Sequence, residues 1–202
     1  MIIKKNIKLG ILLTGVIGLL HAANVALVLQ TGQTAILPLN PAPAGSDGAL
    51  QKGAIWPTPR FVLDTSGNCI TDKLTGLVWI KDPSLINSST VQWQTALDTA
   101  NSGTWCGYDD WRIPNMNELM SLMNYGRIDP TVWLMYGSGT SIEPNCDGAC
   151  FSNVDVPGKY WSSTTVAGNN SNAFYVWMSG YYIGGGGKSF SPAGIWPVRG
   201  GH

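Results

Sequence analysis

Hydrophobic positions recur with a helical period in the middle of the chain. Four apolar residues follow the i, i+3, i+4, i+7 spacing of one helix face: Trp93, Ala96, Leu97 and Ala100. Ser89 and Gln92, three residues apart, resemble a capping box before this helix. We expect a second helix to start at Asn115, with Glu118 in position to reach back to the start of the helix.

Short strands are expected on both sides of these helices. The pattern predicts a hairpin at residues 60–72 and a buried strand at 77–80. Residues 126–158 show no sustained period and are expected to form long loops. The glycines at 184–187 are expected to form a flexible tip. Strand character returns in four segments that should complete one antiparallel sheet: residues 160–163, 173–178, 180–183 and 195–199. This order of elements indicates the α+β class.

The beginning of the chain has the pattern of a secretory signal peptide. Residues 1–8 carry three lysines and no acid, an apolar run follows from Leu9 to Leu20, and Ala22 and Ala23 offer a cleavage site. Apolar character continues to Leu29, so an uncleaved membrane anchor is the alternative. We therefore expect a protein that is secreted, on the cell surface or in the periplasm, with membrane contact only if the leader is uncleaved.

The domain boundaries follow from this leader and from the proline content after it. The linker is rich in Pro, Ala and Gly, and we expect it either to wrap the domain or to stay mobile. The predicted organisation is a signal peptide, a linker and one globular domain, at residues 1–23, 24–54 and 55–202.

Charge is scarce in this sequence. Charged residues make up 12% of the chain, about half the usual share. Without the three leader lysines, nine Lys and Arg residues stand against twelve Asp and Glu residues, and no basic cluster remains. This distribution excludes nucleic acid as a partner. Nine Trp and seven Tyr residues instead favour surfaces that bind by stacking and hydrogen bonding.

Histidine is absent from the predicted domain except at its last position. The two histidines are His21, in the leader, and His202. The domain therefore lacks a histidine for a general base, a catalytic triad or a metal site. Asp109 and Asp110 are adjacent, so on an extended segment their carboxylates point opposite ways. We therefore expect a protein that is not an enzyme.

The four cysteines are disulfide candidates, because export places them in an oxidising compartment. Cys146 and Cys150 flank a turn-like Asp-Gly-Ala spacer and are expected to close a small loop. Cys69 and Cys106 would then pair across the domain. A zinc site is the alternative, although the sequence has no Cys-x-x-Cys motif and no usable histidine.

Four ordered segments carry a resemblance to a known family. They read GNCITDKLTGLVW, GYDDWRIPNMNEL, YWSST and IWPVRGG, at residues 67–79, 107–119, 160–164 and 195–201. In this order and spacing they resemble the Lcl C-terminal domain family over roughly residues 55–201. The resemblance implies a C-type lectin-like fold with two helices, a small antiparallel sheet and a loop-rich face. It also implies glycosaminoglycan binding and trimers, as in a collagen-like bacterial adhesin, but this sequence has no Gly-X-Y tract.

The segment Asp-Trp-Arg-Ile-Pro-Asn at residues 110–115, the motif around Trp111, favours a structural role. Trp111 is expected to fill the core, and Arg112 to bind a carboxylate or carbonyls through its two-pronged guanidinium. Arg199 is expected to be a second clamp of this kind.

Aromatic residues on the last strands are the candidate ligand contacts. Trp177 is expected to lie on the strand face opposite the core. An aromatic ring there is suited to a carbohydrate, because sugars stack their C–H groups on such rings. The full candidate set also includes a lysine and residues of a neighbouring loop: Trp177, Tyr181, Tyr182, Lys188, Asn169 and Asn170. Plain packing and an oligomer interface are the alternatives for these aromatic side chains.

Calcium is an alternative cofactor, and no other cofactor is expected. Residues 143–145 read Glu-Pro-Asn, the sugar- and calcium-binding tripeptide of mannose-type C-type lectins. The side chains that offer oxygen ligands are Glu143, Asn145, Asp147 and Asp155. The second half of that lectin site is missing, because YWSS stands in its place.

These features predict a non-catalytic, adhesin-like binding module that recognises carbohydrate or glycosaminoglycan. The alternative is a protein-interaction or assembly subunit of a cell-envelope or extracellular structure. The expected partner is a glycan or a cell-surface protein, and a homo-oligomer is a further option.

Overall fold

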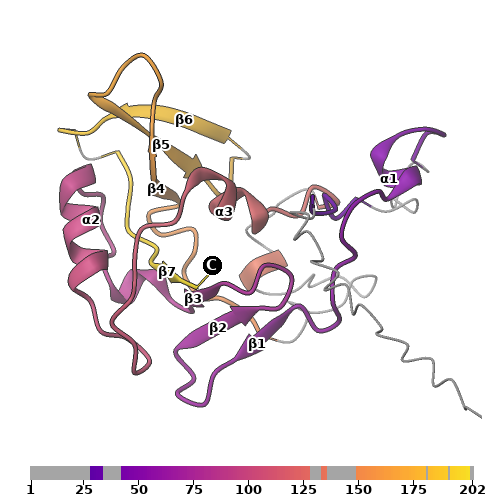
Figure 1. Ribbon diagram of the computed structural model, residues 1–202, viewed down its shortest axis with the longest axis horizontal. Helices are drawn as coiled ribbons and strands as arrows, with labels where there is room; N and C mark the ends of the chain where they lie inside the picture. The colour runs from indigo at the N-terminus through magenta and orange to yellow at the C-terminus, as the bar shows by residue number, and fades with distance from the viewer. Residues whose placement is uncertain are drawn as a thin grey trace, which may run out of the picture.

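The computed structural model describes residues 28–33, 42–127, 133–135, 149–180, 182–190 and 192–200 of the 202-residue chain. The described chain folds into two antiparallel sheets, short helices and long connecting loops, so the predicted α+β class is confirmed (Figure 1). The predicted signal peptide lies outside the described residues. No helix in the described ranges combines the length and the apolar character needed to cross a membrane.

The first sheet has the strand order β1-β2-β3-β7, with every neighbouring pair antiparallel. Its strands are β1 (Phe61–Leu63), β2 (Cys69–Asp72), β3 (Val78–Ile80) and β7 (Val198–Arg199). The predicted hairpin is confirmed, with Leu63 paired to Ile70. Trp79 pairs with Val198, so the beginning and the end of the domain meet in this sheet.

The second sheet is a three-stranded meander with the order β4-β5-β6. Its strands are β4 (Lys159–Thr165), β5 (Asn172–Trp177) and β6 (Tyr182–Gly187). The expectation of a flexible tip at residues 184–187 is wrong, because all four glycines lie in β6 and pair with β5. Neighbouring side chains occupy the space beside them: a Cβ atom at Gly184 would lie 2.4 Å from the Tyr175 ring, and one at Gly187 would lie 2.7 Å from the Phe190 ring.

The prediction that residues 195–199 complete a single sheet is also wrong. The chain touches the second sheet at Gly194, which forms a parallel bridge with Tyr160. It then crosses to the first sheet, where the buried Trp196 donates a hydrogen bond from Nε1 to the Ile80 carbonyl at 2.8 Å. Burial of this large ring between the two sheets fixes where the C-terminal segment pairs.

The two predicted helices are present, but they begin for different reasons. Helix α3 (Met116–Ser121) has the predicted capping box between Asn115 and Glu118. The capping box predicted before α2 (Trp93–Ser102) is wrong, because the N-cap residue Gln92 makes no side-chain cap. The Trp93 amide instead donates to the Lys188 carbonyl at 3.1 Å, so a tertiary hydrogen bond replaces the local one. The described residues also contain two single-turn helices, α1 (Asp47–Leu50) and η1 (Pro83–Leu85), and a helical turn at residues 133–135, inside the region expected to form long loops.

Aromatic rings fill the space between the sheets. Trp196 packs edge-on against Trp79 at 5.4 Å and against Phe151 at 5.3 Å between ring centroids. The predicted apolar face of α2 covers the second sheet, where Ala96 and Ala100 join Trp161 in a buried cluster. This packing attaches the second sheet to α2.

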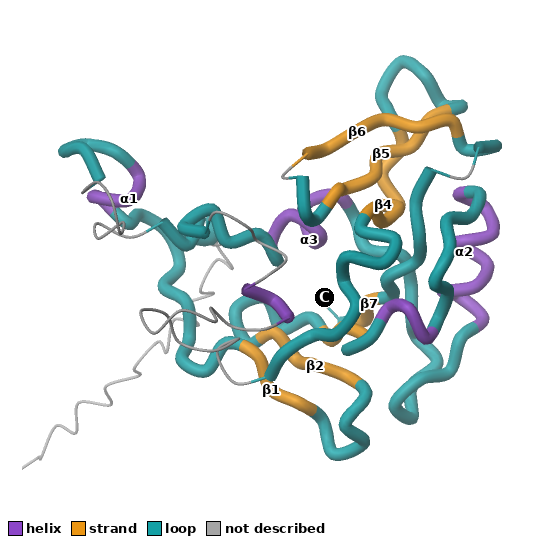
Figure 2. Tube along the Cα trace, turned by 180° about the vertical axis from the view of Figure 1, so that it is seen from behind, coloured by secondary structure: helices purple, strands orange, loops and turns teal. Residues whose placement is uncertain are grey.

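Part of the predicted linker packs on the domain. Leu29 forms a parallel bridge with Ala54, Trp56 Nε1 donates to the Gln30 carbonyl at 3.1 Å, and the Tyr125 amide donates to the Thr31 carbonyl at 2.9 Å. Residues 28–33 therefore wrap the domain. Seen from behind, the segment around α1 lies on the opposite side of the molecule from α2 (Figure 2).

Candidate functional site

The structure separates the predicted ligand contacts into two groups. Trp177 pairs with Tyr182 at one end of the β5–β6 ladder, and Asn172 pairs with Gly187 at the other. Lys188 lies six residues after Tyr182, so about 20 Å of extended chain separates it from the Trp177 end, at roughly 3.4 Å per residue. Asn169 and Asn170 lie in the β4–β5 turn near Lys188, whose amide donates to the Ser171 carbonyl. Tyr181 lies outside the described residues.

The group at the Trp177 end contains a lysine that sequence reasoning missed. Lys159 pairs with Trp177 across β4 and β5, and its ammonium nitrogen lies 4.7 Å from the Trp177 ring centroid and 5.8 Å from that of Tyr175. Trp177 is 40% exposed and Tyr182 is 54% exposed. We call Lys159, Tyr175, Trp177 and Tyr182 the aromatic surface. The predicted position of Trp177 away from the core is confirmed.

Glycines shape this aromatic surface. Gly184 lies opposite Tyr175 in the ladder, and the Tyr175 ring occupies the volume that a side chain at Gly184 would need. A Cβ atom at Gly180 would likewise lie 2.9 Å from the Trp177 ring. The rings therefore lie against bare backbone, which restricts their rotamers.

The contacts of Lys188 indicate a structural role for this residue. The Lys188 ammonium lies 4.1 Å from the centroid of the Trp93 ring and donates to Thr165 Oγ1 at 3.1 Å. Trp93 Nε1 in turn donates to the Ser162 carbonyl at 2.8 Å. Lys188 thus helps to join α2 to β4. The lysine that belongs with Trp177 is Lys159.

The motif around Trp111 is structural, as predicted. Trp111 is 2% exposed. The Arg112 guanidinium donates to both carboxylate oxygens of Glu118, at 2.7 and 2.6 Å, and this hydrogen bonding raises the pKa of Arg112. Arg199 forms a similar pair with Asp110 and lies 3.6 Å from the Tyr108 ring centroid. Arg112 also donates to the Gly200 carbonyl at 3.0 Å, so both arginines tie the segment before α3 to the C-terminal strand.

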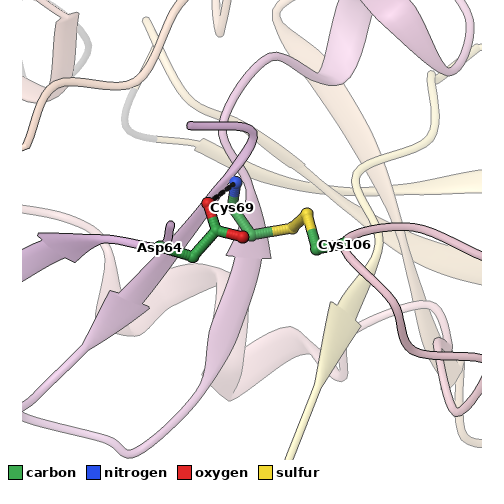
Figure 3. A group of neighbouring side chains, drawn as sticks. All are labelled: Asp64, Cys69 and Cys106. Atoms are coloured by element: carbon green, nitrogen blue, oxygen red, sulfur yellow. Dashed lines mark hydrogen bonds between the residues drawn. A yellow bond between two sulfur atoms is a disulfide. The ribbon is translucent and has the colours of Figure 1, made fainter. Parts of the chain in front are cut away.

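The predicted Cys69–Cys106 disulfide is confirmed (Figure 3). With the nearby Asp64, these cysteines form the one group of potential metal ligands found in the described parts of the chain. Both sulfurs are engaged in the disulfide, so they are not thiolate ligands. Cys150 is also disulfide-bonded, and Cys146, its predicted partner, lies outside the described residues.

Asp64 closes the β1–β2 turn. Its carboxylate accepts hydrogen bonds from the Cys69 amide at 3.0 Å, the Asn68 amide at 3.1 Å and the Ser66 hydroxyl at 2.6 Å. Burial acts to raise the pKa of Asp64, but these hydrogen bonds outweigh it and hold the pKa below its usual value of 3.8. The Asp64 carboxylate therefore stabilises the turn.

The alternative calcium ligands fall mostly outside the described residues. Glu143, Asn145 and Asp147 are in this category, and Asp155 is exposed on the loop before β4. Calcium therefore stays a prediction for solution experiments.

One comparison with known proteins gives a match. The family model of the Lcl C-terminal domain matches residues 68–199, which is most of the chain, and the chain belongs to that family. The match spans strands β2 to β7 and helices α2 and α3, and β1 (Phe61–Leu63) lies before it. No curated protein matches the chain.

Proposed function

We propose that this member of the Lcl C-terminal domain family is a non-catalytic extracellular binding module with a C-type lectin-like fold. Its aromatic surface recognises carbohydrate. The fold proposal rests on two helices packed against small antiparallel sheets with long loops, together with the family resemblance. The signal-peptide pattern of the leader supports export to the periplasm, the cell surface or the medium.

The observation that carries the proposal is the arrangement of Lys159, Trp177 and Tyr182. Two exposed aromatic side chains lie side by side on paired strands, with a cation against one of them. Sugars present apolar C–H faces that pack on such rings, and their hydroxyl groups need the polar partners that an ammonium and a phenol supply. Charge is segregated as well, because no acidic residue follows Asp155 in the sequence. A ligand with carboxylate or sulfate groups therefore meets no repulsion from β4, β5 or β6.

A glycan and glycosaminoglycan array tests this proposal with the full-length protein. We expect binding that Trp177→Ala reduces at least about tenfold. Phe190→Ala is the matched control, because Phe190 is an exposed aromatic (75%) outside the aromatic surface. Lys159→Gln should weaken binding of sulfated or uronate-containing glycans more than binding of neutral ones, because it removes the cation. Urea unfolding curves of each variant establish that it is folded.

The effect of EDTA on glycan binding distinguishes the remaining outcomes. Binding that survives EDTA supports the aromatic surface, because aromatic stacking needs no metal. Binding that EDTA abolishes and Trp177→Ala leaves intact would move the site to the calcium alternative at residues 143–155. Silence across the array from a folded sample would contradict a carbohydrate ligand and favour the alternative function, a protein-interaction or assembly subunit. The exposed apolar side chains around β1 provide a structural basis for that alternative.

A further inference from the structure

A second exposed apolar region surrounds β1, on the sheet that does not carry the aromatic surface. Val62 is 37% exposed and Leu63 is 43% exposed. A cavity of about 400 Å³ opens between β1 and the segment that carries Cys150, and its lining includes Phe61, Val62 and Leu63. Consecutive strand residues point to opposite faces of a sheet, so a cavity that touches all three lies at the outer edge of β1.

The outer edge of β1 has open backbone groups. The Lys73 amide donates to the Arg60 carbonyl, and the Asp64 amide donates to the Cys69 carbonyl. Because hydrogen-bonded pairs alternate in an antiparallel ladder, Val62 bonds to β2, whereas the amides and carbonyls of Phe61 and Leu63 point away from it. Within the described ranges these two residues make no backbone hydrogen bond to another segment.

β1 is short, at three residues, but among the described residues its edge lacks the other features that usually protect one. Protected edge strands carry charged side chains, a bulge or an inserted proline, or are covered by another element. β1 reads Phe-Val-Leu and pairs in regular register with β2. Lys81 is the one charged side chain in the cavity lining, and it takes part in none of the ion pairs found among the described residues.

We propose that the edge of β1 binds an extended, acidic peptide segment of a partner protein, which adds a strand to the first sheet. The backbone of the segment pairs with the open amides and carbonyls of Phe61 and Leu63. Its apolar side chains pack on Val62 and Leu63 at the mouth of the cavity. A carboxylate of the segment meets Lys81, and this charge complementarity selects an acidic peptide over a basic one. The site is independent of the aromatic surface, which lies on the other sheet.

A display library of random nonapeptides, selected on the full-length protein, tests the proposal. We expect enriched peptides with alternating apolar residues and at least one Asp or Glu. Leu63→Asp should lower their binding at least about tenfold, because it removes an apolar contact and places a carboxylate beside an acidic segment. Lys81→Glu should shift the selection from acidic to basic peptides. Phe190→Asp, an equally drastic change at an exposed site just after β6, should leave selection and affinity unchanged.

Several results would overturn the proposal. One is the absence of enrichment on a folded sample, and another is enrichment that persists in both Leu63→Asp and Lys81→Glu. Sedimentation of the wild type as a dimer that Leu63→Asp converts to a monomer would show that a second copy occupies the edge. The glycan array with Trp177→Ala reports on the other sheet, so failure of either proposal is distinguishable from failure of the other.

Discussion

Asp72 binds the Arg60 guanidinium through two hydrogen bonds, of 2.8 and 2.7 Å, and both side chains are fully buried. The guanidinium also lies 4.5 Å from the Trp56 ring centroid and donates to the Ser121 carbonyl at 2.7 Å. This pair therefore connects the first sheet, α3 and the start of the globular domain.

Replacing Asp72 should destabilise the protein severely. Asp72→Asn leaves the Arg60 charge buried without a counter-ion, which costs about 3–5 kcal/mol of unfolding free energy. Asp110→Asn is the matched control, because Asp110 also forms a two-pronged pair with an arginine but its side chain is 50% exposed. An exposed pair of this kind contributes about 1 kcal/mol or less. Urea denaturation of both variants measures the difference, and equal losses would contradict a special role for burial.

The turn at Asp64 predicts a pH dependence. The pKa of Asp64 in the folded protein lies below its usual value of 3.8, so its hydrogen bonds contribute stability above that pH. This contribution is lost as the pH falls through the lowered pKa. Wild type should therefore exceed Asp64→Asn in unfolding free energy near neutral pH, and the gap should close in acid. A gap that is constant from neutral pH to about pH 2 would be inconsistent with this assignment.

Two adjacent glycines of β6 should respond differently to substitution. Gly184→Ala places a methyl group 2.4 Å from the Tyr175 ring, whereas Gly185→Ala meets only Val166, at 3.4 Å. Overpacking should cost the first variant about 1–3 kcal/mol and displace Tyr175. The second should be neutral or slightly stabilising, because alanine loses less entropy than glycine in a strand. Urea midpoints and the near-ultraviolet circular dichroism of tyrosine measure both effects; similar behaviour of the two variants would refute this packing.

The Cys69–Cys106 disulfide should contribute substantially to stability. It closes a loop with a sequence separation of 37 residues, for which chain entropy gives about 4 kcal/mol. The double variant Cys69→Ser, Cys106→Ser should therefore unfold at a clearly lower urea concentration than the wild type. Reducing agent should lower the wild-type midpoint by more than that of the double variant, in which the Cys150 disulfide is still present. An unchanged midpoint in the double variant would show that the disulfide does not stabilise the protein.

Local sequence signals located some elements of the fold well. The Asn115 and Glu118 pair marked the start of α3 because both partners of a capping box lie within one helical turn. The same reasoning failed at α2, where the first amide bonds to the Lys188 carbonyl from a distant segment. Glycines 184–187 looked flexible because a sequence does not show that Tyr175 and Phe190 fill the space beside them.

The sequence by itself determined the family, the α+β class, the β1–β2 hairpin, the helical face of α2, and the exposure of Trp177, because periodicity and short motifs are local properties of the chain. Only the tertiary structure decided the division into two sheets, the partnership of Trp177 with Lys159, and the open edge of β1. The sequence does not show whether Lys188 or Lys159 lies beside Trp177 in space. Strand register places one of them against the ring and the other at the far end of the sheet, and register depends on packing between segments that are distant in sequence.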